Sequence, residues 1–105
     1  MPQVTGTSRW FSADPKENDE DTIEGTYIAD QDLDFTTEPG GKHYRVRLKP
    51  SSPGSATWKG TFVTGTNAAQ PLAARVYTAV DGGIALVGKW IDGGYDYFWV
   101  ADLTH

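Results

Sequence analysis

Residues 42–49 decide the fold, and they read Lys42-His43-Tyr44-Arg45-Val46-Arg47-Leu48-Lys49. Even positions from 44 to 48 are apolar, whereas odd positions from 45 to 49 are basic. Successive side chains of a strand point to opposite faces of a sheet. The alternation therefore predicts a β-strand with one face in the core and the other in water.

A second alternating run, Thr22 to Phe35, precedes this strand and is expected to form one strand of its own. The intervening Glu38-Pro39-Gly40-Gly41 has Pro and Gly at the central places of a turn, so a hairpin is expected. Centring that hairpin on Pro39-Gly40 sets apolar residues opposite apolar ones and acids opposite bases. The expected pairs are Phe35 with Tyr44, Leu33 with Val46, Asp34 with Arg45, and Asp32 with Arg47.

The last third of the chain carries one turn signal twice, Asp-Gly-Gly at residues 81–83 and again at 92–94. Asp-Gly and Gly-Gly between apolar runs are strong hairpin signals, so residues 72–103 are expected to form a three-strand meander. Across its second turn the expected pairs are Lys89 with Asp96, Val87 with Phe98, Trp90 with Tyr95, and Gly88 with Tyr97.

These runs, a strand at residues 56–63 and a short strand at Trp10-Phe11 follow one another in hairpin order, with no helical stretch of ten residues. A flat sheet of this size would leave two edges and an apolar face exposed, and closure removes both. The expected fold is all-β, a small antiparallel up-and-down β-barrel of six to eight strands. A two-sheet β-sandwich is the alternative. One domain is expected over residues 1–105, with a frayed start at residues 1–6 and an acidic loop at residues 12–24.

Composition narrows the possible functions. The chain has 105 residues, a formal charge of −5 and no Cys, which excludes disulfides, thiolate zinc sites and a Cys nucleophile. A net negative charge disfavours nucleic acid and anionic membranes as partners. No run of 18 apolar residues is present, so no transmembrane helix is expected. Residues 1–11 have no apolar signal region, so a cytoplasmic location is expected.

Motifs for catalysis are missing from the sequence. Its two histidines are His43 and the terminal His105, and neither belongs to a Ser-His-Asp pattern or a paired-His metal site. The glycines form no phosphate-binding fingerprint. No catalytic residue, metal or cofactor is expected, and the protein is predicted not to be an enzyme.

Three runs contain a glycine followed two places later by an aromatic residue, namely Gly25-Thr26-Tyr27, Gly60-Thr61-Phe62 and Gly88-Lys89-Trp90. Glycine lets a strand bend tightly or accept a ring packed across it, as curved barrel walls require.

Residues 57–63, Thr57-Trp58-Lys59-Gly60-Thr61-Phe62-Val63, resemble the T-W-x-G-x-Y-V strand of avidin-like barrels. The other two glycine runs resemble strand starts of that family and of lipocalin-type barrels. This motif-level resemblance covers about a third of the chain and implies a barrel architecture. It would place Trp58 at a ligand site. The family's early Asn and Ser contacts and its late Asp have no match here, so biotin is not expected.

Aromatic residues concentrate near the C-terminus and supply the candidate site. The expected function is non-catalytic binding of a small apolar or aromatic ligand in the barrel mouth. The candidate ligand contacts are Trp58, Tyr77, Trp90, Tyr95, Tyr97 and Trp99.

Both faces of the C-terminal meander are apolar, because Val87, Phe98 and Val100 lie opposite the tryptophan face. The segment Trp10-Phe11 covers this second face in one reading. In the alternative function, the face is a protein-interaction or self-assembly surface, and the protein is a homo-oligomer.

Overall fold

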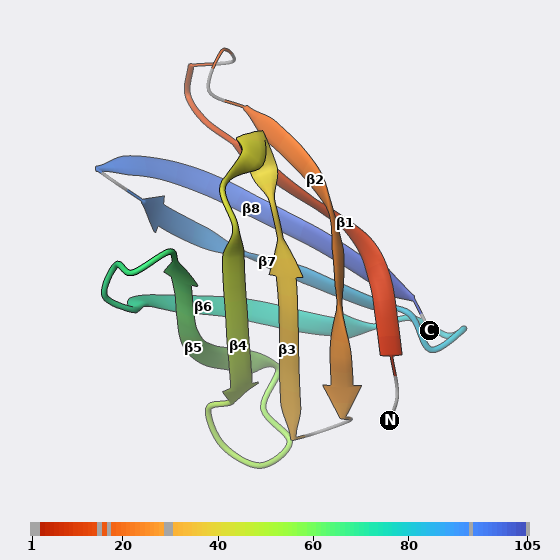
Figure 1. Cartoon of the computed structure of the whole chain (residues 1–105). Coiled ribbons are helices and arrows are strands. Elements are labelled where there is room, and N and C mark those ends of the chain that lie inside the picture. Colours follow the sequence, from red (N-terminus) through yellow and green to blue (C-terminus); the bar gives the residue numbers. More distant parts are fainter. Residues whose placement is uncertain (1–2, 15, 17, 29–30, 93, 105) are drawn as a thin grey trace.

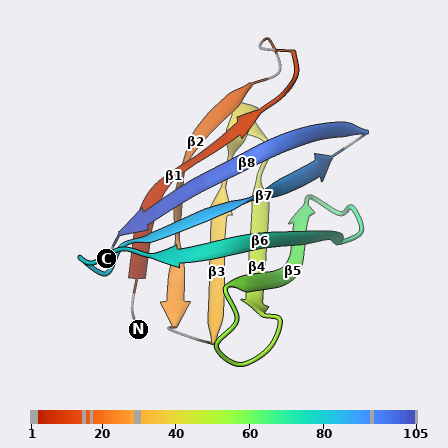
Figure 2. The same cartoon turned by 180° about the vertical axis from the view of Figure 1, so that it is seen from behind.

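The computed structural model describes residues 3–14, 16, 18–28, 31–92 and 94–104, and eight antiparallel strands close into one barrel (Figures 1 and 2). Every strand pairs with its sequence neighbours, and β8 returns to β1. The predicted up-and-down barrel is thereby confirmed. The strands are β1 Gln3–Phe11, β2 Asp19–Ile28, β3 Asp32–Thr37, β4 Tyr44–Pro50, β5 Thr57–Thr64, β6 Gln70–Thr78, β7 Ile84–Asp92 and β8 Tyr95–Thr104, with a 3-10 turn η2 Pro39–Gly41 between β3 and β4.

Alternating strand direction gathers the connections at two ends of the barrel. The β1–β2, β3–β4, β5–β6 and β7–β8 connections lie at one end, which we call the mouth end. The other three connections lie with the chain termini at the opposite end (Figure 1). No helix in the described part of the chain is long and apolar enough to span a bilayer.

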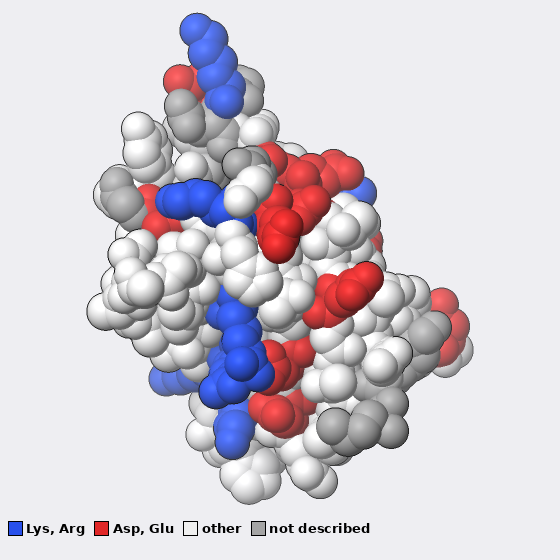
Figure 3. All heavy atoms as spheres, viewed as in Figure 1, with Lys and Arg blue, Asp and Glu red and all other residues white. Residues whose placement is uncertain are grey.

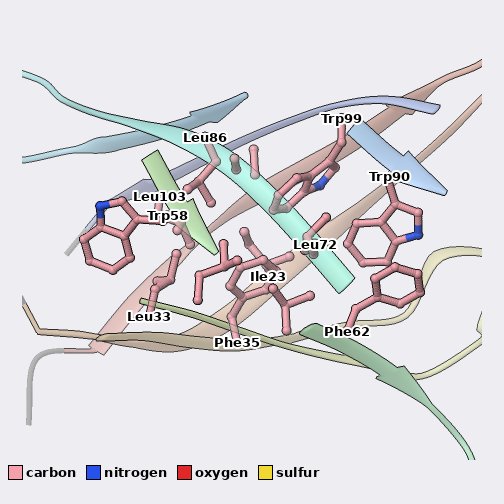
Figure 4. Packing of buried hydrophobic residues seen from close by; sticks show 14 of the residues in the cluster. Ile23, Leu33, Phe35, Trp58, Phe62, Leu72, Leu86, Trp90, Trp99 and Leu103 are labelled. Atoms are coloured by element: carbon pink, nitrogen blue, oxygen red, sulfur yellow. The ribbon is translucent and has the colours of Figure 1, made fainter. Parts of the chain in front are cut away.

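Side chains fill the interior of the barrel, as is usual at eight strands. Phe62 stacks on Trp90 with ring centroids 4.1 Å apart, and Trp90 meets Trp99 edge-on at 5.4 Å (Figure 4). The indole Nε1 of Trp99 donates a hydrogen bond of 2.6 Å to the hydroxyl of buried Ser8. Among the described residues, every buried side-chain nitrogen and oxygen has a hydrogen-bond partner.

The β3–β4 hairpin forms, but its expected register was wrong by two residues. Phe35 pairs with Val46 rather than with Tyr44, and Asp34 pairs with Arg47 rather than with Arg45. The reason is the turn, which spans residues 38–43 and includes η2, so the hairpin is centred one residue later. A shift of two keeps every side chain on its face, and the buried and exposed faces are therefore as expected.

The register of the β7–β8 hairpin also differs from the expected one by two residues. Trp90 pairs with Tyr97, and Gly88 pairs with Trp99. Asp92, which was expected in the turn, pairs with Tyr95 and is the last residue of β7. Gly93 of the turn signal lies outside the described residues.

The acidic loop expected at residues 12–24 was wrong in its second half. β2 begins at Asp19, and Glu20 pairs with Arg9 of β1. The two side chains form an ion pair, with Arg9 Nε 3.1 Å from Glu20 Oε2. The frayed start was also wrong from residue 3 onward, because Val4 is a buried residue of β1. β1 and β2 form because the backbone of each strand provides the hydrogen-bond partners of the other.

The run from Thr22 to Phe35 is two strands rather than one. The amide of Gln31 donates to the carbonyl of Ile28 at 3.0 Å, which closes a turn between β2 and β3. Residues 29–30 lie outside the described residues. The sequence has no Gly or Pro between β2 and β3, so it gives no strong signal that one strand ends and another begins there.

Strand glycines mark places where neighbouring strands approach closely. A Cβ atom on Gly60 would lie 1.8 Å from the carbonyl oxygen of Arg47, and one on Gly88 would lie 2.4 Å from that of Ala73. Gly6 and Gly25 are equally confined by backbone atoms of the next strand. Glycine is therefore required at these positions of the wall, and the aromatic residues two places after Gly60 and Gly88, Phe62 and Trp90, are buried in the interior.

We predict that Gly60→Ala lowers the free energy of unfolding by about 1–3 kcal/mol or more, because the methyl group must displace backbone. Gly54→Ala is the control, since Gly54 has φ +76° but nothing within 4 Å of a Cβ atom. It should cost about 1 kcal/mol. Urea unfolding measures both, and equal losses would contradict the close approach.

Acidic and basic residues run side by side over the outside of β3 and β4 (Figure 3). Arg45 donates to both oxygens of Asp34, at 3.1 and 2.8 Å, and Arg47 Nε lies 3.5 Å from Asp34 Oδ2. The hydrogen bond from Arg45 holds the pKa of the Asp34 carboxyl below its usual value, against the opposing effect of partial burial. The pair therefore stabilises the fold above the unfolded pKa of about 3.8, and this contribution is lost as pH falls through the folded pKa.

A double-mutant cycle of Asp34→Asn and Arg45→Gln should accordingly show favourable coupling in the unfolding free energy at pH 7, and the coupling should weaken as the pH falls below 3.8. Asp32→Asn with Arg47→Gln is the control. Its coupling should be close to zero, because Arg47 forms its ion pair with Asp34 and no ion pair joins it to Asp32 among the described residues. Equal coupling in the two cycles would contradict this assignment of the ion pairs.

Candidate functional site

A cavity of about 380 Å³ opens at the mouth end of the barrel, and we call it the mouth. Its floor consists of three buried aromatic side chains, Trp10, Tyr44 and Trp90. Each comes from an inward position near the end of a strand, in β1, β4 and β7 respectively. Three distant segments of sequence therefore meet there.

Edge-to-face contacts fix the rings of the floor. Trp10 meets Trp90 at a centroid distance of 5.5 Å and an interplanar angle of 87°, and Tyr44 meets Trp90 at 5.6 Å and 78°. Phe62 supports Trp90 from below by stacking. Such aromatic pairs contribute roughly 0.5–1.5 kcal/mol each beyond burial, so the rings of the floor are packed against one another without a ligand.

A hydrogen bond from Tyr44 to Asp92 crosses one side of the mouth. The phenol donates to Asp92 Oδ2 at 2.5 Å. Burial, this hydrogen bond and the Asp92 charge raise the pKa of the Tyr44 phenol well above its usual value. Among the described residues, no cationic nitrogen lies within 4.0 Å of the Asp92 carboxylate.

Tyrosines and charged residues form the wall and rim of the mouth. Tyr95 is 53% exposed, and its ring lies 6.4 Å from that of half-buried Tyr97. Lys16, Asp19 and Lys42 are exposed at the rim. The mouth thus combines an apolar floor with a polar opening, an arrangement typical of small-molecule sites.

Of the six candidate ligand contacts, Trp90, Tyr95 and Tyr97 meet in the mouth. Trp99 is fully buried behind it, where its indole N–H is bonded to Ser8. Trp58, the second residue of β5, lies at the opposite end of the barrel from Trp90 (Figure 4). It is 3% exposed and packs on Tyr27.

Tyr77 lies outside the barrel and was wrongly grouped with the mouth. The inward positions of β6 are 72, 74 and 76, so the next side chain points outward, and Tyr77 is 50% exposed.

Sequence reasoning missed Trp10, Tyr44 and Asp92 as residues of this site. Tyr44 had been assigned to the core, and Asp92 to a turn. Asp92 follows Trp90 by two positions, so the period of a strand continued through residue 92 would have placed its carboxylate on the inner face.

The outer face of the C-terminal meander is not covered by the segment Trp10-Phe11. Trp10 points into the barrel, whereas Phe11 is 42% exposed beside Phe98, which is 53% exposed. Their ring centroids are 6.4 Å apart. The segment forms part of the wall, so the apolar outer face remains open.

No protein-family model matches the chain, and no curated protein sequence matches it significantly. The resemblance to avidin-like barrels therefore stays a prediction. Among the described residues, no group of three His, Asp or Glu side chains is placed to hold a metal ion.

Proposed function

We propose that this protein is a non-catalytic binding protein that holds a small ligand with an apolar or aromatic group in the mouth. The observation that carries the proposal is the preformed floor of Trp10, Tyr44 and Trp90 beneath an open cavity of about 380 Å³. That volume falls in the range of small-molecule sites. A flat ligand would lie between this floor and the rings of Tyr95 and Tyr97.

Binding is favoured over catalysis by the chemistry of the lining. Its described residues include no Ser, Cys or His. The Tyr44–Asp92 pair keeps its proton on the phenol, because the phenol pKa is raised, and a protonated phenol is a poor nucleophile. The lining therefore offers rings and hydrogen-bonding groups rather than an activated group.

Titration of intrinsic Trp fluorescence with 2-naphthol tests this proposal. Tyr95→Ala should weaken binding about two- to tenfold by removing one aromatic contact. Tyr77→Ala is the matched control, because Tyr77 is as exposed as Tyr95 but lies outside the mouth, and it should bind like the wild type. Equal weakening in both variants, or no binding to the wild type, would contradict a site in the mouth.

A second candidate function is self-association through the outer patch, which we define as Phe11, Val87, Ile91, Phe98 and Val100. The register places Phe98 beside Phe11, and Val100 beside Val87, so the patch is continuous across β1, β8 and β7.

Charges of both signs border this patch. Arg9 and Lys89 lie beside Val100 and Phe98, and Asp96 lies beside Ile91. A second copy related by a two-fold axis could therefore set opposite charges against each other. The barrel is closed and offers no free strand edge, so association would depend on side-chain packing.

Size-exclusion chromatography with light scattering tests this candidate. If the patch joins two copies, Phe98→Asp should convert the oligomer to a folded monomer, because an unpaired carboxylate is costly only where a partner excludes water. Val80→Asp is the control, since Val80 is fully exposed and outside the patch. A wild type that is monomeric at every concentration would exclude self-association.

A further inference from the structure

Charges in the mouth are separated by depth. Lys16, Asp19 and Lys42 are exposed at the rim, whereas Asp92 is half-buried on the inner face of β7, next to the floor. Among the described residues, no cation lies within 4.0 Å of its carboxylate. The innermost charge of the mouth is therefore negative and has no counter-ion from the described chain.

The aromatic rings around Asp92 also favour a positively charged ligand. Faces of Trp and Tyr rings carry negative electrostatic potential and attract cations within about 6 Å of the centroid. The chain itself provides one example, because the ammonium group of Lys42 lies 5.9 Å from the centroid of the Tyr44 ring. An ammonium group is thus accommodated against this side of the floor.

An anionic ligand would meet the opposite conditions. It would approach the Asp92 carboxylate and the negative ring faces. Lys16 is exposed at the rim, and the ammonium group of Lys42, which lies over the Tyr44 ring, is the one that could meet an anion near the floor. Burial first, then the hydrogen bond to Asp92 and the Asp92 charge, raise the pKa of the Tyr44 phenol, so a second negative charge at the floor is disfavoured.

Resting on the proposed function, we infer that the ligand of the mouth is an organic cation, an alkylated ammonium group attached to an apolar or aromatic body. The ammonium group lies over the face of the Tyr44 ring and beside the Asp92 carboxylate. It replaces the ammonium group of Lys42, which lies 5.9 Å from the centroid of that ring in the free protein. The apolar body lies against Tyr95 and Tyr97.

The test compares benzyltrimethylammonium with neopentylbenzene, its neutral isostere, and with phenylacetate, by Trp fluorescence and calorimetry. We expect the cation to bind at least about tenfold more tightly than the neutral isostere, and phenylacetate to bind most weakly. Lys42→Gln should tighten binding of the cation severalfold, because it removes the internal competitor for the Tyr44 ring.

Asp92→Asn is the decisive variant, since the amide oxygen can still accept from Tyr44 and the shape of the mouth is kept. It should weaken binding of benzyltrimethylammonium about tenfold and leave binding of neopentylbenzene unchanged. Unchanged binding of neopentylbenzene also shows that the variant is folded. Asp96→Asn is the matched control with the same change in net charge. Asp96 is exposed, does not line the mouth and should have no effect.

Equal affinity for the cation and its neutral isostere, tighter binding of phenylacetate, or equal effects of Asp92→Asn and Asp96→Asn would each overturn the cation inference. Each of these outcomes leaves a binding site in the mouth standing. Failure of all three compounds and of 2-naphthol to bind would overturn the proposed function together with the inference.

Discussion

Closure of the sheet between β1 and β8 is the contact on which the rest of the structure depends. The first and last strands pair along seven residues, from Thr5 with Thr104 to Phe11 with Phe98. The buried hydrogen bond from Trp99 to Ser8 joins the same two strands inside the core. Without this seam the sheet would have two free edges and an open apolar face. Closure also brings β1 across to the side of β7, and so completes the aromatic floor of the mouth.

A full interior decides where binding can occur. An eight-stranded barrel is only wide enough for its own side chains, and here Phe35, Phe62 and Trp99 occupy the centre. A ligand must therefore lie at an end of the barrel rather than within it. At the terminal end Trp58 is already packed on Tyr27. At the mouth end the rings are fixed from below, and the space above them is open.

Strand β8 contributes to both candidate functions because its side chains alternate. Tyr95 and Tyr97 point to the mouth, while Phe98 and Val100 belong to the outer patch. Adjacent residues of one strand therefore separate the candidate ligand site from the candidate association surface. Charge is divided in a similar way. Asp34 on the outside of β3 forms ion pairs with Arg45 and Arg47 of β4, whereas the carboxylate of Asp92 accepts a hydrogen bond from a phenol and has no cation within 4.0 Å among the described residues.

Alternation in the sequence determined the fold class, the barrel topology and the face on which most side chains lie, because an amphipathic strand has a period of two. The same period cannot distinguish registers that differ by two residues, since both bury the same side chains. In both hairpins the observed register differs from the expected one by two residues in the same direction. Asp92 therefore lies in a strand rather than in a turn. Which aromatic residues meet was decided only by the tertiary structure. Trp10, Tyr44 and Trp90 are far apart in sequence, and barrel closure with its register brings them together.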